Sequence, residues 1–104
     1  MSEVDISLVI PTWFIALIEC KIGDPLARRD VVLKGAKVTA KEAVEKRIID
    51  SAHDGPAETV SAAIRLGEQL VGRRWDGHVY AQIRMKLLAR VLDEIGAGSA
   101  RSRM

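Results

Sequence analysis

The side chains that could act as nucleophiles are few, and their spacing argues against a nucleophilic site. Ser51, His53 and Asp54 lie within one short segment. A catalytic triad needs side chains that converge from separate elements, so these near neighbours predict no triad. Cys20 is the only cysteine and has apolar neighbours, which favours a buried small hydrophobic residue over an activated thiolate.

Two further side chains could transfer protons. His78 follows Asp76 and Gly77 at an expected helix start, where a capping or interhelical role is more common than proton transfer. Glu3 precedes an extended apolar run that is typical of a strand. Near a chain end an acidic side chain is ordinarily exposed, so residue type alone does not assign Glu3 a catalytic role.

Length and composition exclude several classes of protein. At 104 residues the chain can form one modest core. Its 16 basic and 14 acidic residues are interspersed, which gives no electrostatic reason to expect a nucleic-acid partner. The apolar stretch Trp13–Ile18 is far too short for a membrane span. We expect a soluble protein with no metal site, because no cluster of metal-ligating residues occurs in the sequence.

Helix start and stop signals divide the first half of the chain. A proline near the first turn and a glycine after the last predict helices from Pro11 to Gly23 and from Asp24 to Gly35. Thr39 with Glu42 three residues later has the form of a capping box, which starts a short third helix. The pair Ile48–Ile49 suggests a brief strand.

The second half predicts two long amphipathic helices. Apolar residues recur at helical spacing from Val60 to Val71 and from Tyr80 to Ile95, after which Gly96 should end the second helix. The predicted fold class is therefore mostly α, with a short strand at the start and another near Ile48.

Five stretches of the sequence, in this order, resemble a known family. They are SEVDISLVIPTWF, KIGDPLARRDVVL, AKVTAKEAVEKRIIDSA, PAETVSAAIRLGEQLV and DGHVY. Together they resemble the carboxy-terminal part of the enoyl-CoA hydratase/isomerase (crotonase) superfamily, and in particular the plant peroxisomal Δ3,Δ2-enoyl-CoA isomerases. The resemblance implies a segment over residues 1–96 from the helical end of a crotonase-like α/β fold, a flexible tail over 97–104, and a role in fatty-acid β-oxidation.

The resemblance also implies a catalytic residue and a substrate pocket. Glu3 occupies the position of the family's glutamate, which takes a proton from C2 of a 3-enoyl-CoA and returns one at C4. The substrate is a coenzyme A thioester and no other cofactor is implied. Ile6, Pro11, Trp13 and Phe14 are the implied walls of an acyl pocket, although paired aromatic residues on a helix more often belong to a core.

The sequence departs from the family pattern in ways that leave alternatives open. Ser7 and Arg47 stand where the family frequently has glycine, and the ββα units that supply its oxyanion hole match nothing here. The alternatives are an enoyl-CoA hydratase, a non-catalytic oligomerisation or assembly module that forms homo-oligomers or joins full-length subunits, and an unrelated helical bundle.

The last three residues suggest a location. Ser102, Arg103 and Met104 resemble a variant of the S-K-L peroxisomal signal: a small polar residue, a cation and an apolar end. With the family resemblance, this tail predicts a peroxisomal protein.

Overall fold

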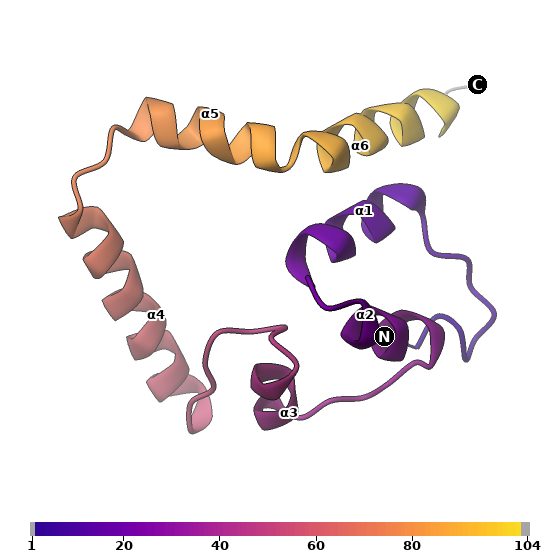
Figure 1. Cartoon of the computed structure of the whole chain (residues 1–104), viewed down its shortest axis with the longest axis horizontal. Coiled ribbons are helices and arrows are strands. Elements are labelled where there is room, and N and C mark those ends of the chain that lie inside the picture. Colours follow the sequence, from indigo (N-terminus) through magenta and orange to yellow (C-terminus); the bar gives the residue numbers. More distant parts are fainter. Residues whose placement is uncertain (1, 103–104) are drawn as a thin grey trace.

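The computed structural model describes residues 2–102, and these residues form helices joined by turns and irregular segments (Figure 1). The helices are α1 (Thr12–Lys21), α2 (Pro25–Leu33), α3 (Ala40–Glu45), α4 (Gly55–Gly72), α5 (Gly77–Leu87) and α6 (Ala89–Ser102). The predicted mostly helical class is confirmed, but no strand occurs within residues 2–102.

Side-chain caps begin α2 and α3 where the sequence predicted them. The Asp24 carboxylate accepts a hydrogen bond from the Leu26 N–H at 3.0 Å, with Pro25 in the first turn of α2. The Thr39 hydroxyl accepts from the Glu42 N–H at 3.2 Å at the start of α3. Each cap satisfies a backbone donor that has no partner within its own helix.

The strand predicted at the start of the chain is wrong. Residues 3–7 form turns instead, in which the Asp5 and Ile6 N–H groups donate to the Ser2 carbonyl and the Leu8 N–H donates to the Glu3 carbonyl. Ser7 has a φ of 57°, which interrupts an extended backbone. A strand needs a neighbouring strand for its backbone groups, and within residues 2–102 these groups are satisfied locally.

The second predicted strand, at Ile48–Ile49, is also wrong. The chain leaves α3 through a helix-ending turn, in which the Ile48 N–H donates to the Ala43 carbonyl and the Arg47 N–H to the Val44 carbonyl. Arg47 takes the left-handed position of this turn, with a φ of 60°. The turn places Ile48 against the core.

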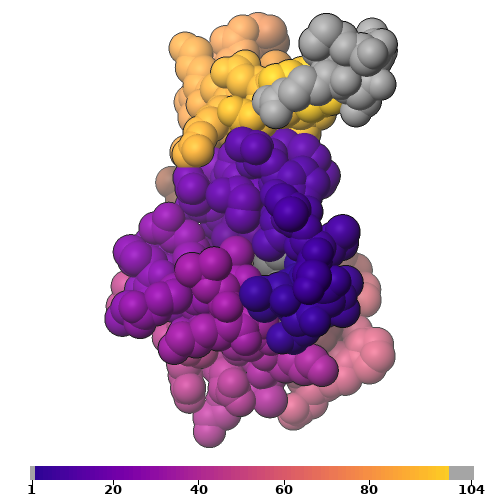
Figure 2. All heavy atoms as spheres, turned by 90° about the vertical axis from the view of Figure 1, so that its right-hand side faces the viewer, coloured from indigo at the N-terminus to yellow at the C-terminus, as the bar shows by residue number. Residues whose placement is uncertain are grey.

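A small core lies around α1. Its buried members are Ile18, Ile22 and Ala27, and four partly buried residues pack against them: Phe14, Ile15, Val32 and Ile48. On its other side α1 packs against α6, where Val91 is buried (Figure 2). An ion pair from Glu19 to Arg90 joins the same two helices. α1 is therefore the central element of the fold.

The helices α4 and α5 have no buried residues. In Figure 1, α4 runs up the left side from near α3, and α5 runs along the top to α6, with a corner between the two helices. The predicted last helix differs as well, because it breaks at Leu88 and then continues through Gly96 to Ser102. The radius of gyration is 16.8 Å, whereas a compact chain of this length has about 13 Å.

Candidate functional site

Glu3, the predicted acid and base, is half-buried in the turn that precedes α1. Its Oε2 atom has almost no accessible surface and no hydrogen-bond donor within reach among residues 2–102. A shielded carboxylate oxygen without a donor costs free energy, which a substrate group that donates a hydrogen bond would recover. The backbone carbonyl of Glu3 accepts from the Leu8 N–H at 2.9 Å, which holds the turn that carries this carboxylate.

Two of the four predicted pocket residues line one hollow. Pro11 and Trp13 border it together with Glu94 and Gly98 of α6. Sequence reasoning missed Glu94, because nothing in the sequence indicates that α6 folds back onto the segment before α1. Glu3 does not line this hollow.

The other two predicted pocket residues lie elsewhere. Ile6 is 67% exposed in the first turn, and Phe14 packs against the core cluster. The Phe14 ring still touches its neighbour, since the centroids of Trp13 and Phe14 are 5.4 Å apart with the planes tilted by 50°. Of the two aromatic residues, Trp13 thus lines the hollow and Phe14 packs against the core.

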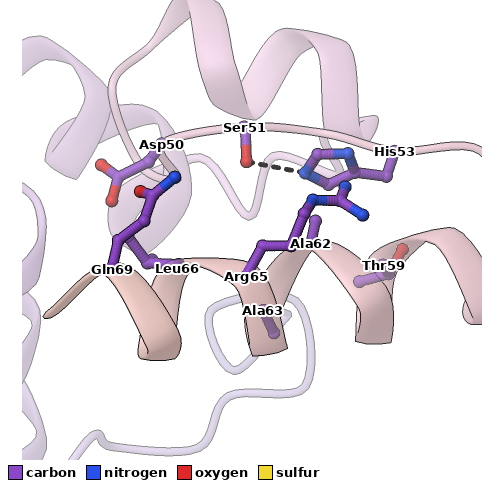
Figure 3. A pocket seen from close by; sticks show the side chains of 9 residues that line it. All are labelled: Asp50, Ser51, His53, Thr59, Ala62, Ala63, Arg65, Leu66 and Gln69. Carbon is purple, nitrogen blue, oxygen red and sulfur yellow. Dashed lines mark hydrogen bonds between the residues drawn. The ribbon is translucent and has the colours of Figure 1, made fainter. Parts of the chain in front are cut away.

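A second hollow lies between residues 50–53 and α4 (Figure 3). Ser51 Oγ and His53 Nε2 are 2.9 Å apart, within hydrogen-bond distance. Asp54 does not line this hollow and forms no side-chain cap for α4. The three residues therefore do not form a triad, as the sequence predicted.

The remaining candidate side chains have local partners or lie open to solvent. His78 pairs with Gln82 one turn further along α5 at 3.1 Å, while Asp76 caps that helix by accepting from the Val79 N–H. Cys20 is exposed, so the prediction of a buried cysteine is wrong. α1 is apolar nearly all round, but α2 and α6 cover only part of its surface.

One carboxylate has clearly altered electrostatics. Asp30 of α2 accepts from Lys46 Nζ at 3.3 Å, and Lys34 Nζ lies 3.5 Å away. The hydrogen bond from Lys46 is the main reason that the pKa of Asp30 lies below its ordinary value. Because Lys46 follows α3, this contact ties α2 to α3 and has a structural role.

Comparison with known proteins shows that the chain is homologous to plant enoyl-CoA delta isomerases. In Arabidopsis thaliana it is similar to the peroxisomal enoyl-CoA delta isomerase 1, with 58% identity over 92 residues, which cover 88% of this chain and 38% of the relative. It is 46% identical over 97 residues to enoyl-CoA delta isomerase 3, covering 89% of this chain and 41% of that relative. With the peroxisomal enoyl-CoA delta isomerase 2 it shares 45% over 97 residues, covering 92% of this chain and 40% of the relative.

The homology predicted from the five sequence stretches is thus confirmed. The chain spans about two fifths of the length of the curated relatives that it matches. No protein-family model and no solved structure matches it. Two of the three relatives carry the word peroxisomal in their names.

One sequence prediction extends beyond the described residues. Of the proposed peroxisomal signal, Arg103 and Met104 lie outside the described residues. Within residues 2–102, no helix has both the length and the hydropathy that a membrane crossing requires.

Proposed function

We propose that this chain acts in an enoyl-CoA isomerase that shifts the double bond of a 3-enoyl-CoA to the 2-position. The observation that carries this proposal is the 58% identity, over 88% of the chain, with a plant enoyl-CoA delta isomerase. The match covers only 38% of that relative. The activity in the relative's name is therefore a proposal for this chain.

In the proposed reaction Glu3 acts as both base and acid. Its carboxylate takes the proton from C2, which leaves a dienolate with negative charge on the thioester oxygen, and the same group returns a proton at C4. The unpaired, shielded Oε2 atom supports this role, since no donor among residues 2–102 competes for it.

The thioester oxygen needs two backbone N–H donors, and each is worth a factor of about 100 or more in rate. In the superfamily that the sequence resembles, these donors belong to ββα units that match none of the 104 residues. We therefore propose that another polypeptide segment supplies them when the site is assembled. The loop before α1 supplies the carboxylate.

Ile6, Pro11, Trp13 and Phe14 are proposed to form the wall of the acyl pocket. In support, Pro11 and Trp13 border one hollow, and Trp13 and Ile6 retain 38% and 67% of their surface exposed. An acyl chain would remove this apolar surface from water. The peroxisome is the proposed location, in keeping with two of the relatives' names.

A specific observation favours a second candidate, a non-catalytic assembly module. The accessible surface of the chain is 8405 Å², whereas a compact protein of this mass exposes about 5,800 Å². Exposed apolar side chains of α4 and α5 contribute to this surface, such as Ile64 and Ile83, which are 56% and 61% exposed. These helices would bind further copies of the chain or full-length isomerase subunits.

Product analysis distinguishes the candidates. The purified chain is incubated with a 3-enoyl-CoA, and separately with a 2-enoyl-CoA, and the products are separated by chromatography. The isomerase proposal predicts formation of the 2-enoyl-CoA from the first substrate. A 3-hydroxyacyl-CoA from the second would identify a hydratase instead.

If neither product forms, the assay is repeated with a full-length plant isomerase added. Sedimentation equilibrium then shows whether the chain binds that enzyme or itself. Binding without turnover would support the assembly module, while a monomer that neither binds nor reacts would contradict both candidates.

A further inference from the structure

The hollow between residues 50–53 and α4 holds a group of polar side chains that the proposed isomerisation does not use. Ala62 is the only residue of α4 that is not exposed, because the 50–53 segment passes over it (Figure 3). This places side chains from two separate parts of the chain around one hollow.

Three hydrogen-bonding groups meet at one end of this hollow. Ser51 Oγ lies 2.9 Å from His53 Nε2, and the Arg65 side chain extends from α4 toward the His53 ring (Figure 3). Within residues 2–102, no carboxylate lies within ion-pair distance of Arg65. The Asp50 carboxylate also lines the hollow, but at the other end, beside Gln69.

This arrangement matches the needs of a tetrahedral oxyanion. A guanidinium offers two parallel N–H donors to phosphate oxygens, and charge-assisted bonds of this kind are about twice as strong as neutral ones. When the His53 ring donates to Ser51 Oγ, the hydroxyl hydrogen of Ser51 is free for a second bond to the anion. The side chains do not lie in one plane, so an anion with oxygens in several directions fits them better than a flat carboxylate.

We propose that Ser51, His53 and Arg65 bind a phosphate group. Asp50 repels an anion from its own end of the hollow and so restricts the phosphate to the end near Arg65. Two sources share this chemistry: free phosphate, and the phosphate groups of coenzyme A. The second source rests on the proposed function, which makes a coenzyme A thioester the substrate.

The test is to titrate the ¹⁵N-labelled chain first with inorganic phosphate and then with coenzyme A. NMR spectra at fixed ionic strength monitor both titrations. We expect saturable shifts of the amide signals of residues 51, 53 and 65, with a dissociation constant in the millimolar range for phosphate, or roughly 4 kcal/mol of binding. Tighter binding of coenzyme A would identify it as the source, while equal affinity would identify free phosphate.

Variants at Arg65 make the result specific to this site. Loss of one charge-assisted contact in Arg65→Gln should weaken phosphate binding about tenfold or more. Arg84→Gln changes an exposed arginine of α5 in the same way, and it should leave the affinity unchanged. Glutamine is a good helix former, so both variants should keep the fold.

Absence of saturable shifts, or equal affinity in the wild type and Arg65→Gln, would overturn this inference. Neither result would affect the isomerase proposal, because that proposal is tested by turnover and by its dependence on Glu3. Conversely, a Glu3 variant that has lost turnover should still bind phosphate at Arg65 with the affinity of the wild type.

Discussion

At the scale of single residues, three residues with a Cβ atom have a left-handed backbone that glycine would adopt without strain: Ser7, Arg47 and Arg74. Ser7 and Arg47 have φ values of 57° and 60°, and both stand where the resembling family frequently has glycine. A left-handed conformation costs a residue with a Cβ atom roughly 1–2 kcal/mol. Arg47 is held there because the turn after α3 must satisfy the last carbonyls of the helix and place Ile48 in the core.

We therefore predict that Arg47→Gly stabilises the fold. The relief of strain exceeds the extra freedom that glycine gives the unfolded chain, so the free energy of unfolding should rise by about 0.5–1 kcal/mol. Urea denaturation followed by circular dichroism measures it. Glu45→Gly is the matched control in the last turn of α3 and should lower the same free energy by about 1 kcal/mol. A destabilised Arg47→Gly would refute this view of the turn.

Asp30 gives a pH dependence with a definite sign. Its pKa is lowered in the folded state, mainly by the hydrogen bond from Lys46. The unfolded chain therefore binds a proton at Asp30 more readily than the folded chain does. The stabilisation is fully present above the ordinary pKa of an aspartate and is lost as the pH falls through the lower, folded value.

Replacing Asp30 by asparagine should remove this part of the pH dependence. The urea midpoint of the wild type should fall more steeply between about pH 5 and pH 3 than that of Asp30→Asn. Asp93→Asn, which changes an exposed carboxylate of α6, should follow the wild type. Equal slopes for wild type and Asp30→Asn would mean that the Lys46 contact does not form in solution.

At the scale of elements, α6 packs on α1 and forms one border of the hollow beside Trp13. Val91 is buried at this contact with 6% of its surface exposed, whereas its neighbour Leu92 is 48% exposed. Val91→Ala should lower the free energy of unfolding by about 1–2 kcal/mol through lost burial and a residual cavity. Leu92→Ala removes a larger side chain but should cost less. The reverse order in chemical denaturation would show that α6 packs with another face.

Helix starts could be predicted from the sequence, whereas strands and contacts between distant helices could not. The starts of α2 and α3 depend on caps within three residues, so Asp24 and Thr39 could be identified without tertiary information. A strand depends on a distant partner, which is why the strands predicted before Pro11 and at Ile48 were wrong. Glu94 was missed for the same reason, because its approach to Trp13 depends on contacts between distant helices.

At the scale of the whole molecule, the open shape and the homology support one account. The chain spans about two fifths of its curated relatives, and α4 and α5 have no buried residue of their own. A chain of this length ordinarily buries most of its apolar helix faces. We infer that the loop that carries Glu3 works within a larger assembly, which contributes the proposed oxyanion donors and covers these helices.

The central claim is that the carboxylate of Glu3 transfers the proton, and one comparison tests it most directly. It is the ratio of kcat/KM for a 3-enoyl-CoA between the wild type and Glu3→Gln, measured in the assembly that gives turnover. Asp5→Asn, an exposed carboxylate in the same turn segment, serves as the control. Our account predicts a loss of at least about 100-fold for Glu3→Gln and little change for Asp5→Asn. Equal turnover by Glu3→Gln and the wild type would contradict the assignment of Glu3.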